Sequence, residues 1–225
     1  MVPWPNTFDR AGIVCLRVAD PVKKQAEQHA SQLRSALIKS FRDDRMRLLL
    51  VGTFLAALMG TQMFTTFSIF MTDEIGVRAA DVGLLYGLNG LGVLLLQLPG
   101  IAFVRRFGIA TVLPWASLLN SAGFALIGLA TGNAGAALAI ITITTAEVML
   151  APAHQTAIAE VADPMNRGRA FGVVGFAQMV GIAVAPLLGG LLFDAIRHHH
   201  AAMWAVIASI GIVQAVCFAA FVRKV

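Results

Sequence analysis

Long stretches without a charged residue constrain this chain more than any other feature. No Asp, Glu, Lys or Arg occurs from Phe107 to Ala146, and none from Val148 to Ala159. Only 13% of the residues are charged, against about a quarter in soluble domains. A bilayer core about 30 Å thick needs roughly 20 apolar residues per helix. Apolar segments of that length predict an all-α integral membrane protein with six transmembrane helices, at residues 46–71, 82–104, 109–130, 135–157, 170–193 and 201–222.

The basic residues indicate how these segments cross the membrane. Of the 17 lysines and arginines, 15 lie in the leader up to Arg47, after the second and fourth segments or in the C-terminal tail; the exceptions are Arg78 and Arg197. Because Lys and Arg concentrate on the cytoplasmic side, we expect both termini in the cytoplasm and the chain in the plasma or inner membrane of the cell. The net charge of +5 comes from these basic residues beside the membrane, which would face anionic lipid headgroups. The charge therefore does not indicate a nucleic-acid partner.

Residues 1–45 form a polar leader ahead of the membrane domain, residues 46–225. Asp20 followed by Pro21 is typical of a helix start, and apolar residues then recur every three or four positions up to Phe41. This pattern predicts an amphipathic cytoplasmic helix. A helix lying on the membrane surface and a solvated linker helix fit it equally well.

Motifs for ATP-driven or hydrolytic chemistry are missing from the sequence. It contains no phosphate-binding loop ending in Gly-Lys-Ser or Gly-Lys-Thr, no HExxH and no GxSxG. The three histidines of "RHHH" at 197–200 would point in three directions on a helix, so we expect solvated side chains rather than a metal site. We therefore expect no enzyme activity, no metal and no other cofactor.

One carboxylate lies inside the apolar segments. Glu147 falls within residues 135–157, and a charged group near the bilayer centre costs about 2.5–3.5 kcal/mol, so such residues are usually paired or functional. His154 follows on the same helical face, about 10 Å further along the axis. With Gln62 and Asn89 they form the predicted substrate or proton pathway. The alternative for each is structural: a hydrogen-bonded acid, an interfacial histidine, and amides that join helices.

Small residues at four-residue or shorter spacing mark two helical faces for close contact. These residues are Gly83, Gly87 and Gly90 in the second segment, and Ala177, Gly181, Ala185 and Gly189 in the fifth. Each face would suit contact with a second helical bundle or packing within this one. Both interpretations stay open.

Three stretches together resemble the Major Facilitator Superfamily, and more narrowly the C-terminal six-helix half of its drug:proton antiporter-type members. They are "TTFSIFMTDEIGVRAADVGLLYGLNGLGVLLLQLPG", "PGIAFVRRFG" and "AEVMLAPAHQTAIAEVADPMNRGRAFGVVG". The second is a degenerate form of the family's signature loop, since Val104 stands where the family usually has aspartate. The resemblance covers residues 46–225.

This resemblance implies two six-helix halves with the substrate site between them, of which this chain contains one. The leader would be the cytoplasmic linker between the halves. Segments 46–71 and 135–157 would line the central cavity, 82–104 and 170–193 would contact the other half, and 109–130 and 201–222 would face lipid. The cytoplasmic gate loops would contain Arg105, Arg106, Asp163, Arg167 and Arg169.

Three functions fit these observations. The first is a transporter that pairs with itself or with a separate N-terminal half and moves a small, drug-like solute by alternating access, with or without proton coupling. The second is a non-transporting membrane scaffold or a truncated fragment of a twelve-helix transporter. The third is an unrelated six-helix carrier that works as a homodimer.

Overall fold

The computed structural model describes residues 43–162, 167–196 and 198–224. Over these ranges it contains helices and no strand, which confirms the predicted all-α class. Residues 43–225 form one compact unit. The predicted amphipathic helix of the leader lies outside the described residues, as does Asp163.

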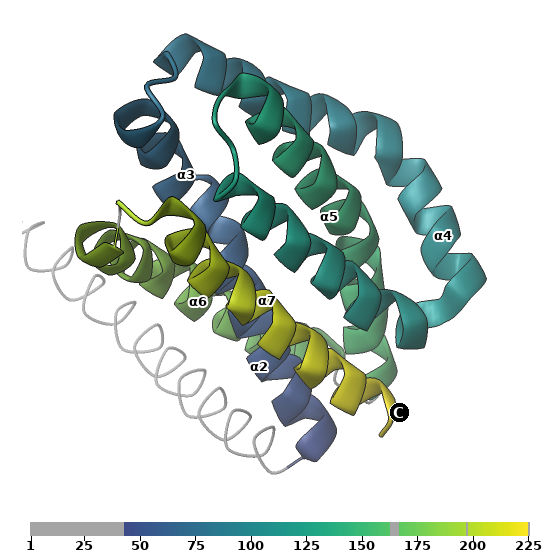
Figure 1. Ribbon diagram of the computed structural model, residues 1–225. Coiled ribbons are helices and arrows are strands. Elements are labelled where there is room, and N and C mark those ends of the chain that lie inside the picture. Colours follow the sequence, from purple (N-terminus) through teal and green to yellow (C-terminus); the bar gives the residue numbers. More distant parts are fainter. Residues whose placement is uncertain (1–42, 163–166, 197, 225) are drawn as a thin grey trace, which may run out of the picture. The chain divides into compact units, whose positions relative to one another are not determined.

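Helices follow one another with short connections (Figure 1). In chain order they are α2 (Asp44–Gly60), the 3₁₀ turn η1 (Thr61–Met63), α3 (Thr66–Ile69), the π-helix η2 (Phe70–Glu74), α4 (Ala79–Ile127), α5 (Asn133–Val161), α6 (Arg167–Ile196) and α7 (His200–Val222). Five helical stretches of the described chain are long and apolar enough to cross a membrane: Asp44–Glu74, α4, α5, α6 and α7.

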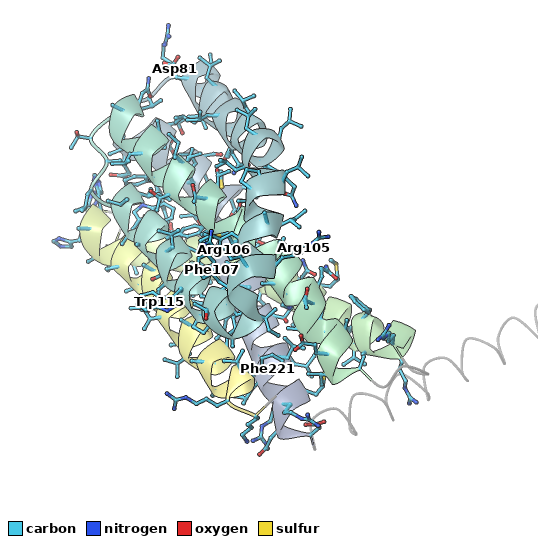
Figure 2. All side chains as sticks on the ribbon, turned by 90° about the vertical axis from the view of Figure 1, so that its right-hand side faces the viewer. Asp81, Arg105, Arg106, Phe107, Trp115 and Phe221 are labelled. Atoms are coloured by element: carbon cyan, nitrogen blue, oxygen red, sulfur yellow. The ribbon has the colours of Figure 1, made fainter. Side chains whose placement is uncertain are left out.

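The second and third predicted segments are the two legs of α4, which meet at a sharp kink. Gly108 interrupts α4 with φ 73° and ψ 161°, a conformation that essentially only glycine adopts. Figure 1 shows α4 folding back on itself, so that its two legs run in opposite directions. In Figure 2, Asp81 lies at the far end of the first leg from Arg105 and Arg106, which precede the bend. Counting the two legs separately gives the six predicted segments.

The first predicted segment is broken, contrary to the expectation of one continuous helix. After α2 the chain passes through the 3₁₀ turn, and Thr65 takes φ −113° and ψ −81°, outside the helical range, before α3 and the π-helix. Threonine hydroxyls bond to carbonyls one turn back, from Thr61 to Ala57 (2.8 Å) and from Thr65 to Thr61 (3.1 Å). Such bonds compete with the helix backbone and favour a bend.

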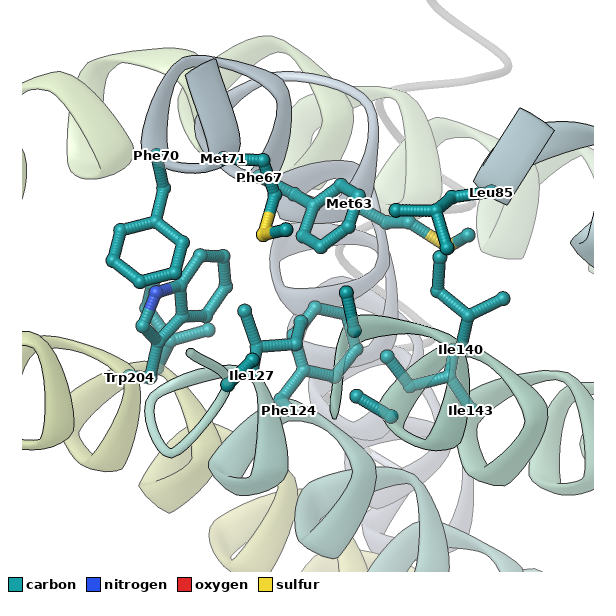
Figure 3. Packing of buried hydrophobic residues seen from close by; sticks show 14 of the residues in the cluster. Met63, Phe67, Phe70, Met71, Leu85, Phe124, Ile127, Ile140, Ile143 and Trp204 are labelled. Atoms are coloured by element: carbon teal, nitrogen blue, oxygen red, sulfur yellow. The ribbon is translucent and has the colours of Figure 1, made fainter. Parts of the chain in front are cut away.

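Aromatic packing holds this broken segment against the rest of the bundle. Phe70 meets Trp204 of α7 edge to face at 5.5 Å, and Phe124 of the second leg of α4 stacks on the same indole at 6.3 Å. All three side chains are fully buried, and Figure 3 shows them with Ile127 and the α5 residue Ile143 around them. Edge-to-face and stacked aromatic pairs add about 0.5–1.5 kcal/mol each beyond the area that they bury.

The bend of α4 generates the first prediction. Gly108→Ala should lower the free energy of unfolding by about 1–3 kcal/mol, because alanine is strained at this φ and ψ. Nothing in the described chain lies within 4 Å of a Cβ built at Gly108, so steric overlap would not contribute.

Gly87→Ala is the matched control, since Gly87 lies in the helical first leg of α4 and its Cβ would also meet open space. Thermal unfolding of both variants in detergent measures the effect. Equal melting temperatures would show that the positive φ at the bend is not required.

Candidate functional site

Glu147 lies in the middle of α5 and is held by a side chain of α4. Asn89 Nδ2 donates to Thr144 Oγ1 at 2.8 Å and to Glu147 Oε2 at 3.4 Å. Thr144 in turn donates to the carbonyl of Ile140 at 2.8 Å. Thr144 is buried, whereas Asn89 and Glu147 are each partly exposed. The carboxylate therefore has one long, weak hydrogen bond and an open side.

Close helix packing brings Asn89 to α5. A Cβ on Gly92 would lie 2.9 Å from Thr144 Cγ2, and one on Gly100 would lie 2.6 Å from the carbonyl oxygen of Val148. Both glycines share the helical face of Asn89, three and eleven positions further on. A larger residue at either position would push α4 away from α5 and withdraw the Asn89 amide from Glu147.

His154 has different neighbours from Glu147, although both belong to α5. Its Nε2 lies 2.6 Å from Thr53 Oγ1 of α2, and its ring centroid lies 6.2 Å from that of Phe218 in α7. The Thr53 hydroxyl also donates to the Leu49 carbonyl at 2.7 Å, which leaves its oxygen free to accept a hydrogen bond from the imidazole. The structure thus places His154 at the contact of α2, α5 and α7, apart from the Asn89–Glu147 pair.

Gln62 is enclosed within the bundle. Its Nε2 donates to the carbonyls of Ala185 (2.8 Å) and Leu58 (3.3 Å), and its Oε1 accepts from Thr66 Oγ1 (2.5 Å). The side chain is 0% exposed, and these bonds occupy the amide. Gln62 accordingly joins the broken first segment to α6, as an interhelical amide does in lipid.

The two small-residue faces differ in what they contact. On α6, Gly181, Ala185 and Gly189 are buried. A Cβ on Gly181 would lie 2.6 Å from the Phe54 carbonyl oxygen, and one on Gly189 would overlap Thr66 and Gln62. This face is therefore a packing surface inside the bundle, and Ala177 at its start is half-buried.

The other face carries Gly83, Gly87 and Gly90. All three are exposed, and nothing in the described chain lies within 4 Å of a Cβ built on any of them. This face is open to a neighbour, which the α6 face is not.

Four basic residues of the predicted gate loops lie at the surface. Arg105 and Arg106 are exposed at the bend of α4, where Arg106 lies over the ring of Phe107 at 5.4 Å (Figure 2). Arg167 and Arg169 are exposed in the first turn of α6. Their predicted acidic neighbour, Asp163, is outside the described residues. Within the described residues, no cluster of three His, Cys, Asp or Glu side chains could hold a metal ion.

The sequence predicts Glu147 and Asn89, which lie in contact, but not the residues that bring them together. Thr144 and the glycines at 92 and 100 were not singled out, although Thr144 precedes Glu147 by three residues and the glycines share the face of Asn89. Thr53, the partner of His154, is distant in sequence, and no sequence pattern points to it. The broken helix was signalled only by the threonines at 61, 65 and 66.

The helical bundle and its carboxylate within the apolar spans define a multi-pass membrane protein. The family model described as Major Facilitator Superfamily matches residues 49–225. The chain belongs to this family. The third hypothesis of the sequence analysis, an unrelated carrier, is therefore wrong.

Among curated relatives, the "Uncharacterized MFS-type transporter YqjV" of Bacillus subtilis is 28% identical over 171 residues, 75% of this chain and 42% of that protein. "Multidrug resistance protein MdtH" of Photorhabdus laumondii is 28% identical over 164 residues, 71% of this chain and 40% of that protein. The chain thus spans about two fifths of the length of these relatives.

A solved structure has a similar fold. A POT family transporter crystallised with a thioalcohol-conjugated peptide aligns with a TM-score of 0.67 at 13% identity, over 99% of this chain and 55% of that one.

The buried face of α6 generates the second prediction. Gly189→Ala should lower the free energy of unfolding by about 1–3 kcal/mol, because the new methyl group must displace Thr66 or Gln62 from their hydrogen bond. Gly190→Ala, at the next residue, meets open space and should leave stability unchanged or slightly raised.

Thermal unfolding in detergent compares the two alanine variants directly. If they melt at the same temperature, the packing of α6 on the broken first segment is refuted.

Proposed function

We propose that this chain supplies one six-helix half of a membrane transporter that moves a small, amphipathic, drug-like solute by alternating access. Membership of the Major Facilitator Superfamily supports transport rather than enzyme activity, and the name of the MdtH relatives supports a drug-like solute. The single observation that carries the proposal is the partly exposed carboxylate of Glu147 within α5, with one weak bond from Asn89.

The geometry supports a carboxylate that changes its charge or its partner during transport. The shorter bond of Asn89, to Thr144, does not involve the carboxylate, and neither do the contacts at Gly92 and Gly100. Protonation or solute binding at Glu147 would therefore leave the α4–α5 packing in place. An intramembrane acid arranged in this way is suited to carrying a proton or binding a cationic group of the solute.

A second bundle completes the proposed transporter. In the most apolar stretch of each helix, 11% of α4 and 17% of α6 is buried inside the bundle. The corresponding share for Asp44–Glu74 is 44%. Large apolar side chains exposed on the first leg of α4 are Leu84, Leu91, Leu94, Leu95 and Leu98. Together with the open glycine face they would contact a second copy of the chain or a separate N-terminal half.

The proposed location is the inner or plasma membrane, with both termini in the cytoplasm. At one end of the bundle Lys224 pairs with Asp44 at 2.6 Å, and Arg47 pairs with the same carboxylate at 2.7 Å. This end is richer in basic residues than the end where Arg78 pairs with Asp81, as expected for a cytoplasmic side. Arg105, Arg106, Asp163, Arg167 and Arg169 would then form the cytoplasmic gate loops.

The alternative is a fragment or scaffold that has the fold but does not transport. The matches to transporters do not favour this alternative. Flux through vesicles that contain the purified chain separates this alternative from a transporter built from two copies of the chain.

Glu147→Gln generates the third prediction. In proteoliposomes, pH-gradient-driven uptake of the dye ethidium should fall to the level of empty vesicles, because glutamine keeps the size and polarity of the side chain but can carry neither charge nor proton. Folding should be retained, as judged by the elution volume and melting temperature in detergent.

Glu160→Gln is the control variant: the same substitution on the same helix, at an exposed position near the end of α5. It should retain full uptake. Equal uptake by the two glutamine variants would reduce Glu147 to a structural acid, and no uptake by the unmodified chain would exclude a transporter built from two copies of it.

A further inference from the structure

The break in the first membrane segment is held by Tyr86 of α4. The Tyr86 hydroxyl donates to the carbonyl of Met63 at 2.7 Å and accepts a hydrogen bond from Ser68 at 2.5 Å. Phe67, which is fully buried, meets the tyrosine ring edge to face at 6.0 Å. Two hydrogen bonds and a ring contact thus fix the orientation of Tyr86.

Phe64 covers the remaining side of this tyrosine. The two rings are stacked, with centroids 5.7 Å apart and planes inclined by 20°. Phe64 itself is 64% exposed. A rigid tyrosine therefore supports a phenylalanine whose outer face is available to another flat ring, the arrangement that offset aromatic stacking requires.

This aromatic pair lies beside the candidate site. Tyr86 precedes Asn89 by three residues on α4, and side chains at that spacing are neighbours on a helix, with Cβ atoms about 5–6 Å apart. Asn89 reaches Glu147. The exposed ring of Phe64, between η1 and α3, is thus linked to the carboxylate through Tyr86 and its helical neighbour Asn89.

The alternative interpretation of the exposed Phe64 is that it contacts lipid. The chain offers a comparison for that case: Phe103 and Phe107 are also exposed, and their rings lie 4.4 Å apart in a tilted pair near the bend of α4. The two rings contact each other, and Arg106 lies over that of Phe107. Among the described residues no hydrogen-bonded tyrosine supports them. Phe64 differs in this respect.

We propose that Phe64 and Tyr86 form a ring-stacking subsite that selects solutes carrying a flat aromatic ring. The subsite holds the ring while the polar part of the solute lies towards Asn89 and Glu147. This inference rests on the proposed transport function for its solute, and it adds two residues that determine which solutes are accepted.

Binding of two probes of equal charge tests the subsite. Ethidium is a flat aromatic monocation and tetrapropylammonium is an aliphatic one; equilibrium dialysis against the purified chain in lipid nanodiscs gives both affinities. Phe64→Leu should weaken ethidium binding roughly tenfold, at the upper end of what one aromatic pair contributes, and should leave tetrapropylammonium binding unchanged. Tyr86→Phe, which keeps the ring, should bind ethidium better than Tyr86→Leu.

Phe103→Leu is the matched control and should bind both probes as the unmodified chain does. The subsite is refuted if Phe64→Leu and Phe103→Leu bind ethidium equally, if Phe64→Leu weakens both cations alike, or if the unmodified chain shows no saturable ethidium binding. Failure of the proposed function is recognised separately, as unchanged uptake by Glu147→Gln in vesicles. In that case a ring-dependent loss of ethidium binding in Phe64→Leu would still support the subsite.

Discussion

The contact of Asn89 with Thr144 and Glu147 is the interaction on which the site depends. A bilayer core provides no water to hydrogen-bond a carboxylate, so the donor must come from a neighbouring helix. Gly92 and Gly100 make this possible, because α4 can approach the backbone of α5 only where side chains are absent. The two glycines therefore set the distance between α4 and α5. That distance in turn decides whether Asn89 can reach Glu147.

Other polar groups in the spans serve mainly to hold helices together. Gln62 joins the broken first segment to α6 with its amide fully bonded, and Thr53 joins α2 to His154. Glu147 differs from them because it is partly exposed and has a single long bond. The break next to Gln62 contributes to the same surface, since it presents Phe64 beside Tyr86. Glu147 and the ring of Phe64 thus remain accessible, whereas Gln62 is enclosed.

The sequence predicted the parts of this structure that follow from the bilayer. Runs of apolar residues gave the spans to within a few residues for α5, α6 and α7, and the isolated charge identified Glu147. The connection predicted between residues 104 and 109 contains Gly108, but the sequence could not show that the chain turns at this one residue, because a positive φ leaves no pattern in neighbouring residues. Helical spacing identified faces but not partners: Gly181, Ala185 and Gly189 pack on the first segment, whereas Gly83, Gly87 and Gly90 remain open. Choosing between such faces requires the tertiary arrangement.

The most direct test of the account is whether positions 89 and 147 are neighbours in a membrane. In a chain with Cys15→Ser and Cys217→Ser, Asn89→Cys combined with Glu147→Cys should be joined in high yield by a short bifunctional thiosulfonate, detected by peptide mass spectrometry of isolated membranes. Gly83→Cys combined with Glu147→Cys, which starts from the open face of α4, should give little product. No cross-link between 89 and 147, or equal yields from the two pairs, would contradict the arrangement of α4 and α5 from which the site is built.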